Sequence, residues 1–332
     1  MTLLLTGSTG FVGRNLLLRV LRDGSFQRIV LPVRDEAKLR RQLAADGFPS
    51  LPKGVEVRPS YPAAWEKRVR CDVVVHAAAV LFGRSWEEYE RVNIEGTRAL
   101  LSAVSGKPRV ILISSQSAGG PTPRGTTFRD EKTADAPISD YGRSKRDMER
   151  MVFREFPNAN VLALRPPMVL GARDLATLPL FAMAASRIRV KPGWAHKTYS
   201  WIAVEDLIDA ILATLRPDPP ESRRRVFYVA NPNSITDSEL ISAAVRASAG
   251  PRGMVLRLPQ TVLRIAAKVV DAVPSLRSSV PSLTRDRAVE LFRDRWVVSG
   301  DAFSAAFAFT PTRTLDSALE SWVAQRRSTE SL

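Results

Sequence analysis

Tyr141 and Lys145 lie four residues apart in the stretch YGRSK. If the following residues, through Phe153, continue a helix that begins near Asp140, both side chains lie on one face of it. A phenol has an unperturbed pKa of about 10, and an ammonium group one turn away lowers that pKa. Such a tyrosine can exchange a proton with a substrate oxygen. The spacing also arises by chance, so its meaning depends on the neighbouring motifs.

Two serines, Ser114 and Ser115, follow the apolar run Val110–Ile113. A hydride added to a carbonyl leaves developing alkoxide charge, which requires a hydrogen-bond donor and a proton source. Ser115 is the candidate donor and Tyr141 the candidate proton source. A serine at a strand end more commonly caps a turn, but its pairing with Tyr141 favours the catalytic interpretation.

The N-terminus carries a glycine-rich motif between two expected elements. Residues 2–6 (TLLLT) predict a short buried strand, and Arg14–Leu21 shows helical periodicity. Between them stand Gly7, Gly10 and Gly13, which let backbone N–H groups approach a pyrophosphate at the helix N-terminus. The pattern predicts a dinucleotide site. The alternative is a plain strand–turn–helix junction with three chance glycines.

The residues after the second expected strand, Arg28–Val33, indicate which dinucleotide is bound. An acid there would bind the ribose 2′-hydroxyl of NAD, whereas Arg34 suits the 2′-phosphate of NADP. Arg14 and Lys38 are further candidate positive contacts. NADP(H) is therefore preferred, and Asp35 keeps NAD(H) possible. A solvated basic helix start is the alternative explanation of the charges.

Further motifs follow in order and complete a pattern. They are His76-Ala-Ala-Ala79 after a strand, Asn93-Ile-Glu-Gly-Thr97, Ser114-Ser115, Tyr141…Lys145, and Arg165-Pro-Pro-Met-Val-Leu-Gly171. The chain resembles the extended short-chain dehydrogenases/reductases, within the NAD-dependent epimerase/dehydratase and 3β-hydroxysteroid dehydrogenase-like group. The resemblance covers essentially the whole chain.

The resemblance implies a role for each motif residue. Tyr141 is the implied catalytic acid/base, Lys145 holds the nicotinamide ribose and tunes Tyr141, and Ser115 binds the reacting oxygen. Substrate contacts are implied for Ser115, Gln116 and Tyr141. Asn93 is expected to shape the site helix rather than react. The implied cofactor contacts are Thr6, Gly7, Thr9, Gly10, Phe11, Val12, Gly13, Arg14, Arg34, Lys38, His76, Ala77, Ala78, Ala79, Asn93, Ser114, Tyr141, Lys145, Pro166, Pro167, Met168 and Val169.

Two departures from the family pattern narrow the expected reaction. Dehydratases of the group carry an Asp-Glu pair after the catalytic hydroxyl, where this chain has Gln116 and Ser117. Nucleotide-sugar enzymes tend to carry an asparagine after the arginine of the strand-end motif, where this chain has Pro166 and Pro167. The double proline is more typical of steroid, flavonoid and other non-sugar carbonyl reductases.

The expected function is that of an NADP-preferring oxidoreductase that interconverts a carbonyl and an alcohol on a mid-sized, non-sugar substrate. One alternative is a nucleotide-sugar epimerase with tightly bound NAD. Another, from a different class, is a non-catalytic dinucleotide-sensing regulator. Such regulators usually lose the tyrosine or the lysine, so the intact set of Ser115, Tyr141 and Lys145 argues against it.

The expected fold is a doubly wound α/β Rossmann sheet with a smaller, discontinuous C-terminal substrate lobe. We predict a dinucleotide-binding domain over residues 1–166 plus about 199–231, and a lobe over 167–198 and 232–332. The expected strands lie near 2–6, 28–33, 54–58, 72–76, 109–114, 160–165 and 226–230.

Composition bounds the remaining possibilities. One cysteine and two histidines among 332 residues predict no disulfide and no ordinary metal site. The net charge of +15 is scattered, which disfavours specific nucleic-acid binding. No apolar run approaches a membrane span, and the first strand leaves no room for a signal peptide, so a cytoplasmic protein is expected. The resemblance also implies a homodimer.

The segment Leu258–Val273 has the pattern of an amphipathic basic helix. Such a helix could lie on a membrane interface, which would give peripheral membrane contact. Covering the substrate lobe with its apolar face is the commoner role and is preferred here.

Overall fold

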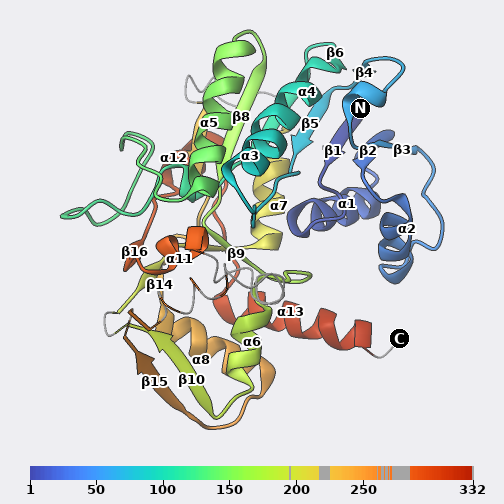
Figure 1. Cartoon of the computed structure of the whole chain (residues 1–332). Helices are drawn as coiled ribbons and strands as arrows, with labels where there is room; N and C mark the ends of the chain where they lie inside the picture. The colour runs from blue at the N-terminus through green and yellow to red at the C-terminus, as the bar shows by residue number, and fades with distance from the viewer. Residues whose placement is uncertain are drawn as a thin grey trace.

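Short runs of valine, isoleucine and leucine form a parallel sheet in the computed structural model. The model describes residues 1–193, 196–216, 225–259 and 285–330, together with residues 261, 262, 265, 268 and 270. The sheet has seven strands in the order β13-β8-β7-β5-β1-β2-β3 (Figure 1). Because the order runs outward in both directions from β1 and β5, the predicted doubly wound fold is confirmed. The strands are β1 (Thr2–Thr6), β2 (Arg28–Val33), β3 (Val55–Pro59), β5 (Val73–His76), β7 (Arg109–Ile113), β8 (Asn160–Arg165) and β13 (Val226–Tyr228).

The predicted strands agree closely with these bounds. The ranges 2–6, 28–33 and 160–165 are reproduced, and the other four differ by one or two residues at their ends. The late strand joins the sheet edge as predicted, because Val226 pairs in parallel with Ala163 of β8.

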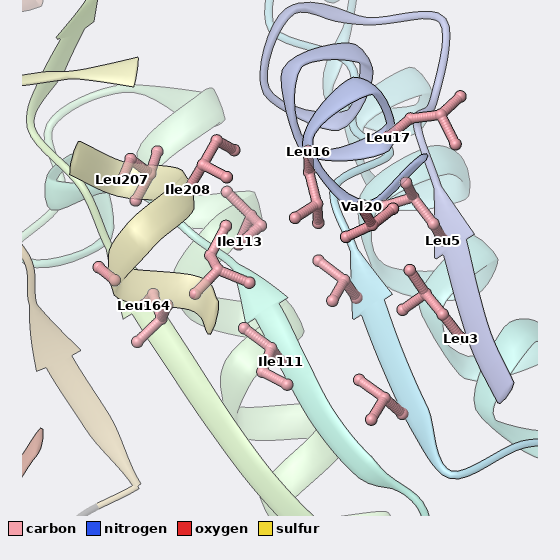
Figure 2. Packing of buried hydrophobic residues seen from close by; sticks show 14 of the residues in the cluster. Leu3, Leu5, Leu16, Leu17, Val20, Ile111, Ile113, Leu164, Leu207 and Ile208 are labelled. Carbon is pink, nitrogen blue, oxygen red and sulfur yellow. The ribbon is translucent and has the colours of Figure 1, made fainter. Parts of the chain in front are cut away.

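Alternate residues of each strand pack on opposite faces of the sheet, as the period of a strand requires. Leu3 and Leu5 lie in one apolar cluster, whereas Leu4 lies in another. The first cluster includes residues of α1 (Phe11–Asp23), α2 (Glu36–Ala45), α7 (Val204–Ala213) and α12 (Asp301–Phe307). Figure 2 shows α1 and α7 lying over this face. The second cluster includes residues of α4 (Gly96–Ser102) and α5 (Asp140–Glu155).

A third apolar cluster lies below the sheet in Figure 1. It joins α6 (Leu178–Ala184), α8 (Asp237–Ser248) and α13 (Leu315–Glu330), and the rings of Phe181 and Trp322 stack 3.9 Å apart within it. Helix α8 begins with a capping box between Thr236 and Glu239. A C-terminal lobe would require an apolar core of its own, and this cluster is separate from the two that cover the sheet. The division into two domains stays a prediction.

Short strand pairs connect these parts. They are β9 (Met168–Leu170) with β12 (Trp201–Ala203), β10 (Ile188–Pro192) with β15 (Met254–Leu258), and β4 (Val69–Arg70) with β6 (Val104–Ser105). A three-stranded group combines β11 (Thr198–Tyr199), β14 (Ile235–Thr236) and β16 (Arg295–Trp296). The remaining helical elements are α3 (Trp86–Tyr89), α11 (Arg285–Leu291), a π-helical turn (Glu90–Glu95) and short 3₁₀ turns at Pro62–Ala64 and Gln116–Ala118.

No helix within the described ranges is long and apolar enough to cross a bilayer. The segment Leu258–Val273, predicted as an amphipathic helix, lies mostly outside the described residues. Its proposed roles therefore stay predictions.

Candidate active site

The turn between β1 and α1 is built around Gly7. Its φ of +73° lies in the left-handed region, and a Cβ there would come within 2.7 Å of the Ala77 and Ala78 backbone. Only glycine fits such a position without strain. The turn therefore lies directly against the residues that follow β5, so two of the predicted cofactor motifs meet.

The N-terminus of α1 is open to an anion. Gly10 precedes the helix without a side-chain cap, and the first turn has no acidic residue. The first N–H groups of a helix lack internal acceptors, and the helix dipole favours negative charge beside them. In the same turn, the Ser8 hydroxyl oxygen is buried and makes no hydrogen bond in the described structure. A glycine cradle, an uncapped helix and an orphaned hydroxyl fit the phosphates of a bound dinucleotide.

The end of β2 holds the residues that predict cofactor choice. Asp35 caps α2 by accepting a hydrogen bond from the Lys38 backbone N–H at 2.8 Å. Arg34 and Lys38 are exposed. Arg14, predicted as a further phosphate contact, is ion-paired instead with Asp46 at 2.7 Å. Asp46 also pairs with Arg173 at 2.8 Å, so it ties the ends of α1 and α2 to the loop after β9.

His76 at the end of β5 is a buried, neutral side chain. One ring nitrogen lies 2.7 Å from the Thr6 hydroxyl and the other lies 2.8 Å from the Thr97 hydroxyl. Burial, assisted by the charge of Lys145, lowers the pKa of His76 to about 3. Thr6 also accepts a hydrogen bond from the Ala78 N–H at 3.2 Å. His76 thus fixes the backbone beneath the predicted cofactor motif and is uncharged at neutral pH.

Asn93 lies in the π-helical turn, where it is fully engaged. Its side-chain oxygen accepts from the Val80 N–H at 2.9 Å, and its amide donates to the Ser144 hydroxyl at 2.9 Å. Ser144 in turn donates to the Tyr141 carbonyl at 2.8 Å. These contacts match the expectation that Asn93 shapes the helix of the site.

Helix α5 carries Tyr141 and Lys145, as the sequence predicted. Ser139 caps it by accepting from the Gly142 N–H at 3.0 Å. A Cβ at position 142 would overlap the Ser117 carbonyl, so glycine there lets α5 approach the turn that carries Ser115. Lys145 is buried and donates to the Ile113 carbonyl at 2.7 Å. Ser115 and Tyr141 therefore come from segments in direct contact.

Ser115 caps the short turn that follows β7. Its hydroxyl oxygen accepts from the Ser117 N–H at 3.1 Å. Gln116 donates its backbone N–H to the Pro166 carbonyl at 2.9 Å, and its buried side-chain oxygen lacks a hydrogen bond in the described structure. The β7 turn and the Pro166-Pro167 segment are thus joined. The orphaned Gln116 oxygen is available to a ligand bound there.

Ser114 faces away from this turn. Its hydroxyl donates to Glu149, which is ion-paired with Arg165 at 2.6 Å. Arg165 also pairs with Asp135 at 2.7 Å. Any cofactor contact of Ser114 therefore has to come from its backbone, and that contact stays a prediction.

The electrostatic environment of Tyr141 differs from the predicted one. Burial raises the pKa of Tyr141, whereas the charge of Arg287 and hydrogen bonding with Ser115 act to lower it. Burial also lowers the pKa of Lys145 to about 8, against the opposing effect of Glu149. The prediction that Lys145 brings the Tyr141 pKa below its usual value is therefore wrong for this structure. The reason is that burial of the phenol has the largest effect, and the cation that acts against it is Arg287.

That cation, Arg287, is the functional residue that sequence reasoning missed. It lies in α11, and its guanidinium carbon is 4.7 Å from the centre of the Tyr141 ring and 6.0 Å from that of Phe82. An ion pair with Glu290 at 2.8 Å holds it in place. A guanidinium over an aromatic face is attracted by the ring quadrupole. No local motif marks Arg287, because it is one of many arginines in a basic chain.

The residues beside Arg287 attach α11 to α5. Asp286 accepts from the Asp140 N–H at 2.6 Å and from the Tyr89 hydroxyl at 3.1 Å. Glu290 accepts from the hydroxyl of Ser139, the residue that caps α5. Carboxylates at a helix N-terminus interact favourably with its dipole. The start of the catalytic helix is thus stabilised by a segment far away in the sequence.

The remaining predicted cofactor residues come from three parts of the chain. Thr9 lies in the β1–α1 turn and Phe11 and Val12 begin α1, Ala77–Ala79 follow β5, and Met168 and Val169 begin β9. Among the described residues, no cluster of three or more His, Cys, Asp or Glu side chains could hold a metal ion.

The comparison with protein families decides the assignment. The model of the NAD-dependent epimerase/dehydratase family matches residues 3–229, which include every predicted site residue. The chain belongs to this family. Helix α11, with Arg287, lies outside the matched region of this epimerase/dehydratase chain.

Individual relatives of this family member include two reductases. The ceramide reductase of Caulobacter vibrioides is 28% identical over 298 residues, which cover 89% of this chain and 85% of that protein. The 4-hydroxy-2-methyl-3-oxo-4-farnesyl-3,4-dihydroquinoline-1-oxide ketoreductase of Stigmatella aurantiaca is 29% identical over 201 residues, 58% of each chain. These matches confirm the prediction of an extended short-chain dehydrogenase/reductase with oxidoreductase chemistry.

Solved structures share the fold of the epimerase/dehydratase family. The structure of UDP-glucuronic acid 4-epimerase from Bacillus cereus, in complex with UDP-glucuronic acid and NAD, matches with a TM-score of 0.75. It is 18% identical and the match covers 99% of this chain and 100% of that one. At that identity the match shows the fold alone.

Proposed function

We propose that the protein is an NADP(H)-preferring oxidoreductase that interconverts a carbonyl and an alcohol on a mid-sized, largely apolar, non-sugar substrate. The observation that carries the proposal is the meeting of two segments. Helix α5, with the buried phenol of Tyr141 and the Lys145 ammonium, meets the turn of Ser115 at the carboxyl ends of the strands, where open parallel sheets bind ligands.

Each residue has a distinct role in the proposed reaction. The bound nicotinamide supplies or accepts the hydride. In reduction, Ser115 orients the substrate oxygen by a hydrogen bond, and the Tyr141 O–H gives its proton to that oxygen as negative charge develops. Lys145 is held by the Ile113 carbonyl, where it can meet the ribose hydroxyls. In oxidation the same groups act in reverse, and the Tyr141 phenolate takes the alcohol proton.

The preference for NADP(H) is supported by the local charges at the end of β2. The Asp35 carboxylate is occupied as the cap of α2, while Arg34 and Lys38 extend into solvent. An exposed guanidinium suits the planar oxygens of a 2′-phosphate. Arg14 contributes less to this proposal, because Asp46 neutralises it.

The non-sugar preference is supported by Gln116, Ser117 and the Pro166-Pro167 segment. Neither Gln116 nor Ser117 titrates, so water elimination from a sugar lacks its acid and base. The name of the Caulobacter vibrioides relative points in the same direction. We further propose that residues 167–198 and 232–332 form the substrate lobe, that the protein is a homodimer, and that it is cytoplasmic.

The test uses the purified protein with NADPH or NADH deuterated at nicotinamide C4. Ketones and aldehydes of graded chain length are the apolar probes, and UDP-glucose and UDP-glucuronic acid are the sugar nucleotides. We expect NADPH oxidation with an apolar probe and deuterium on the carbinol carbon.

A nucleotide-sugar epimerase would give the opposite result. It would copurify with NAD and interconvert a sugar nucleotide without net cofactor turnover. Absence of turnover with every probe, together with dinucleotide binding, would support the non-catalytic alternative and contradict the proposal.

A further inference from the structure

A two-stranded ribbon at the bottom of Figure 1 exposes apolar side chains. It pairs β10 (Ile188–Pro192) in parallel with β15 (Met254–Leu258), far from the seven-stranded sheet. The exposed fractions of Ile188, Val190, Met254, Val255 and Leu256 are 57%, 38%, 66%, 46% and 46%. Contiguous exposed apolar patches on soluble proteins usually mark interaction sites.

In β10 the apolar side chains are exposed and the charged ones are buried, which is the reverse of the usual pattern in a strand at the surface. Ile188 and Val190 point outward, whereas Arg189 and Lys191, on the opposite face, are 5% and 1% exposed. The Arg189 guanidinium donates to the Pro251 carbonyl at 2.5 Å. Lys191 pairs with Asp237 of α8 at 2.8 Å. The cations thus anchor the ribbon to the protein, and the apolar residues form its outer face.

Register places the outer residues of both strands on one surface. Ile188 pairs with Met254, and Val190 pairs with Leu256. Partners in register lie on the same side of a sheet. Two of the described residues that follow β15, Val262 and Ile265, are also exposed at 47% and 63%. Ile188, Val190, Met254 and Leu256 therefore form one apolar surface across the ribbon, whereas Val255 pairs with Arg189 on the other face.

The charge around this surface has one sign. Arg187 and Arg252, which immediately precede the two strands, are exposed, whereas Arg257 pairs with Lys191 and belongs to the other face of the ribbon. Neither 187–192 nor 252–258 contains an aspartate or glutamate, in a chain whose net charge is +15. A second copy of the chain would bring arginines against arginines, which disfavours self-association through this face. The apolar side chains and the flanking positive charges are together complementary to a partner that has an apolar interior beneath an anionic surface layer.

We propose that the outer face of the β10–β15 ribbon docks on the surface of an anionic lipid bilayer. The apolar side chains enter the boundary between headgroups and acyl chains, while Arg187 and Arg252 contact lipid phosphates. This inference goes beyond the proposed function and does not depend on it. The protein would bind the membrane peripherally, with the outer face of the ribbon toward the bilayer.

Vesicle flotation of the full chain tests the proposal. The probes are phosphatidylcholine vesicles with and without phosphatidylglycerol, each at low and high salt. We expect binding to the anionic vesicles, weaker binding to the neutral ones, and release at high salt.

Two variants separate the contributions of charge and apolar contact. Changing Arg187 and Arg252 to Gln should lower partition into anionic vesicles about tenfold or more. The apolar variant changes Ile188, Met254 and Leu256 to Ser, and should weaken binding to both vesicle types. All five side chains are exposed, so the thermal midpoint and dinucleotide affinity should be unchanged.

A matched control carries Tyr61→Ser and Arg154→Gln, which alter an exposed apolar residue and an exposed cation elsewhere. It should bind vesicles as the unmodified chain does. The proposal is overturned if the unmodified chain does not float with anionic vesicles, or if both ribbon variants bind like the control. It is also overturned if the apolar variant abolishes self-association in sedimentation without altering flotation, because a second copy would then be the occupant.

Discussion

The two sides of Tyr141 are built in different ways. The cofactor side is made by motifs local in sequence, such as the Gly7 turn against Ala77 and Ala78. The other side is made by α11, which brings Arg287 over the phenol from far along the chain. The first side forms the expected cofactor site, and the second affects the pKa of Tyr141. Recognisable motifs can thus leave the electrostatics of a site undefined.

On the cofactor side, the largest effect is expected from Gly7→Ala. A methyl group there meets the Ala77 backbone at 2.7 Å in a left-handed conformation. Strain and overpacking together should cost about 3 kcal/mol of unfolding free energy. We expect a lower thermal midpoint in calorimetry and dinucleotide affinity reduced at least about tenfold in titration, since a pyrophosphate needs this turn.

Gly24→Ala is the matched control for that variant. Gly24 also has a positive φ, of +62°, but nothing lies within 4 Å of a Cβ there. It should lose only about 1 kcal/mol of stability and keep its dinucleotide affinity. Equal loss of affinity in both variants would show that the close approach at Gly7 is not what shapes the site.

A smaller effect is expected from Arg34→Ser, which tests cofactor choice. Removal of one charge-assisted contact to a phosphate should weaken NADPH binding about tenfold and leave NADH binding unchanged. Arg40→Ser is the control, because Arg40 is exposed on α2, the helix that follows Arg34, and pairs with Glu36 at 2.6 Å. Isothermal titration with both cofactors measures the ratio. A parallel loss for NADH and NADPH would remove the basis for the NADP preference.

The smallest expected effect is a shift in the pH dependence of kcat/KM on removal of the Arg287 charge, and it is specific to the α11 side. The Arg287 charge acts to lower the pKa of Tyr141, so Arg287→Met should raise that pKa further. In alcohol oxidation the phenolate is the base, and kcat/KM rises with pH through this pKa. The rising limb should therefore move to higher pH in the variant.

Arg287→Lys, which keeps the charge, should retain more of the original profile. The measurement is the pH dependence of kcat/KM, with circular dichroism to check folding. An unchanged profile in a folded Arg287→Met variant would show that α11 only positions α5.

The sequence predicted the sheet because alternating burial leaves a strong local signal. Leu3, Leu4 and Leu5 each pack on a defined face, and the strand around them was assigned to the residue. The site helix and its Tyr141 and Lys145 were found for a similar reason, since their spacing is local. Ser115 and Tyr141 also lie in one crossover connection, between β7 and β8.

Contacts between residues far apart in the sequence could not be predicted from such local patterns. Nothing near Arg14 indicates that Asp46 neutralises it, because the pair forms only when α1 and α2 pack together. The effect of Arg287 on Tyr141 depends on Asp286 and Glu290 attaching α11 to α5. The pKa of a buried phenol depends on burial and on every nearby charge and hydrogen bond, whereas a Tyr-x-x-x-Lys spacing indicates only one neighbouring charge.

The central claim is that Tyr141 transfers the proton while the cofactor is held independently of it. Its most direct test is Tyr141→Phe, with kcat measured on the best substrate of the carbonyl panel and NADPH affinity measured by titration. The account predicts that kcat falls about a thousandfold while the affinity for NADPH stays within about twofold of the unmodified protein. Turnover close to that of the unmodified protein, with the cofactor still bound, would contradict it.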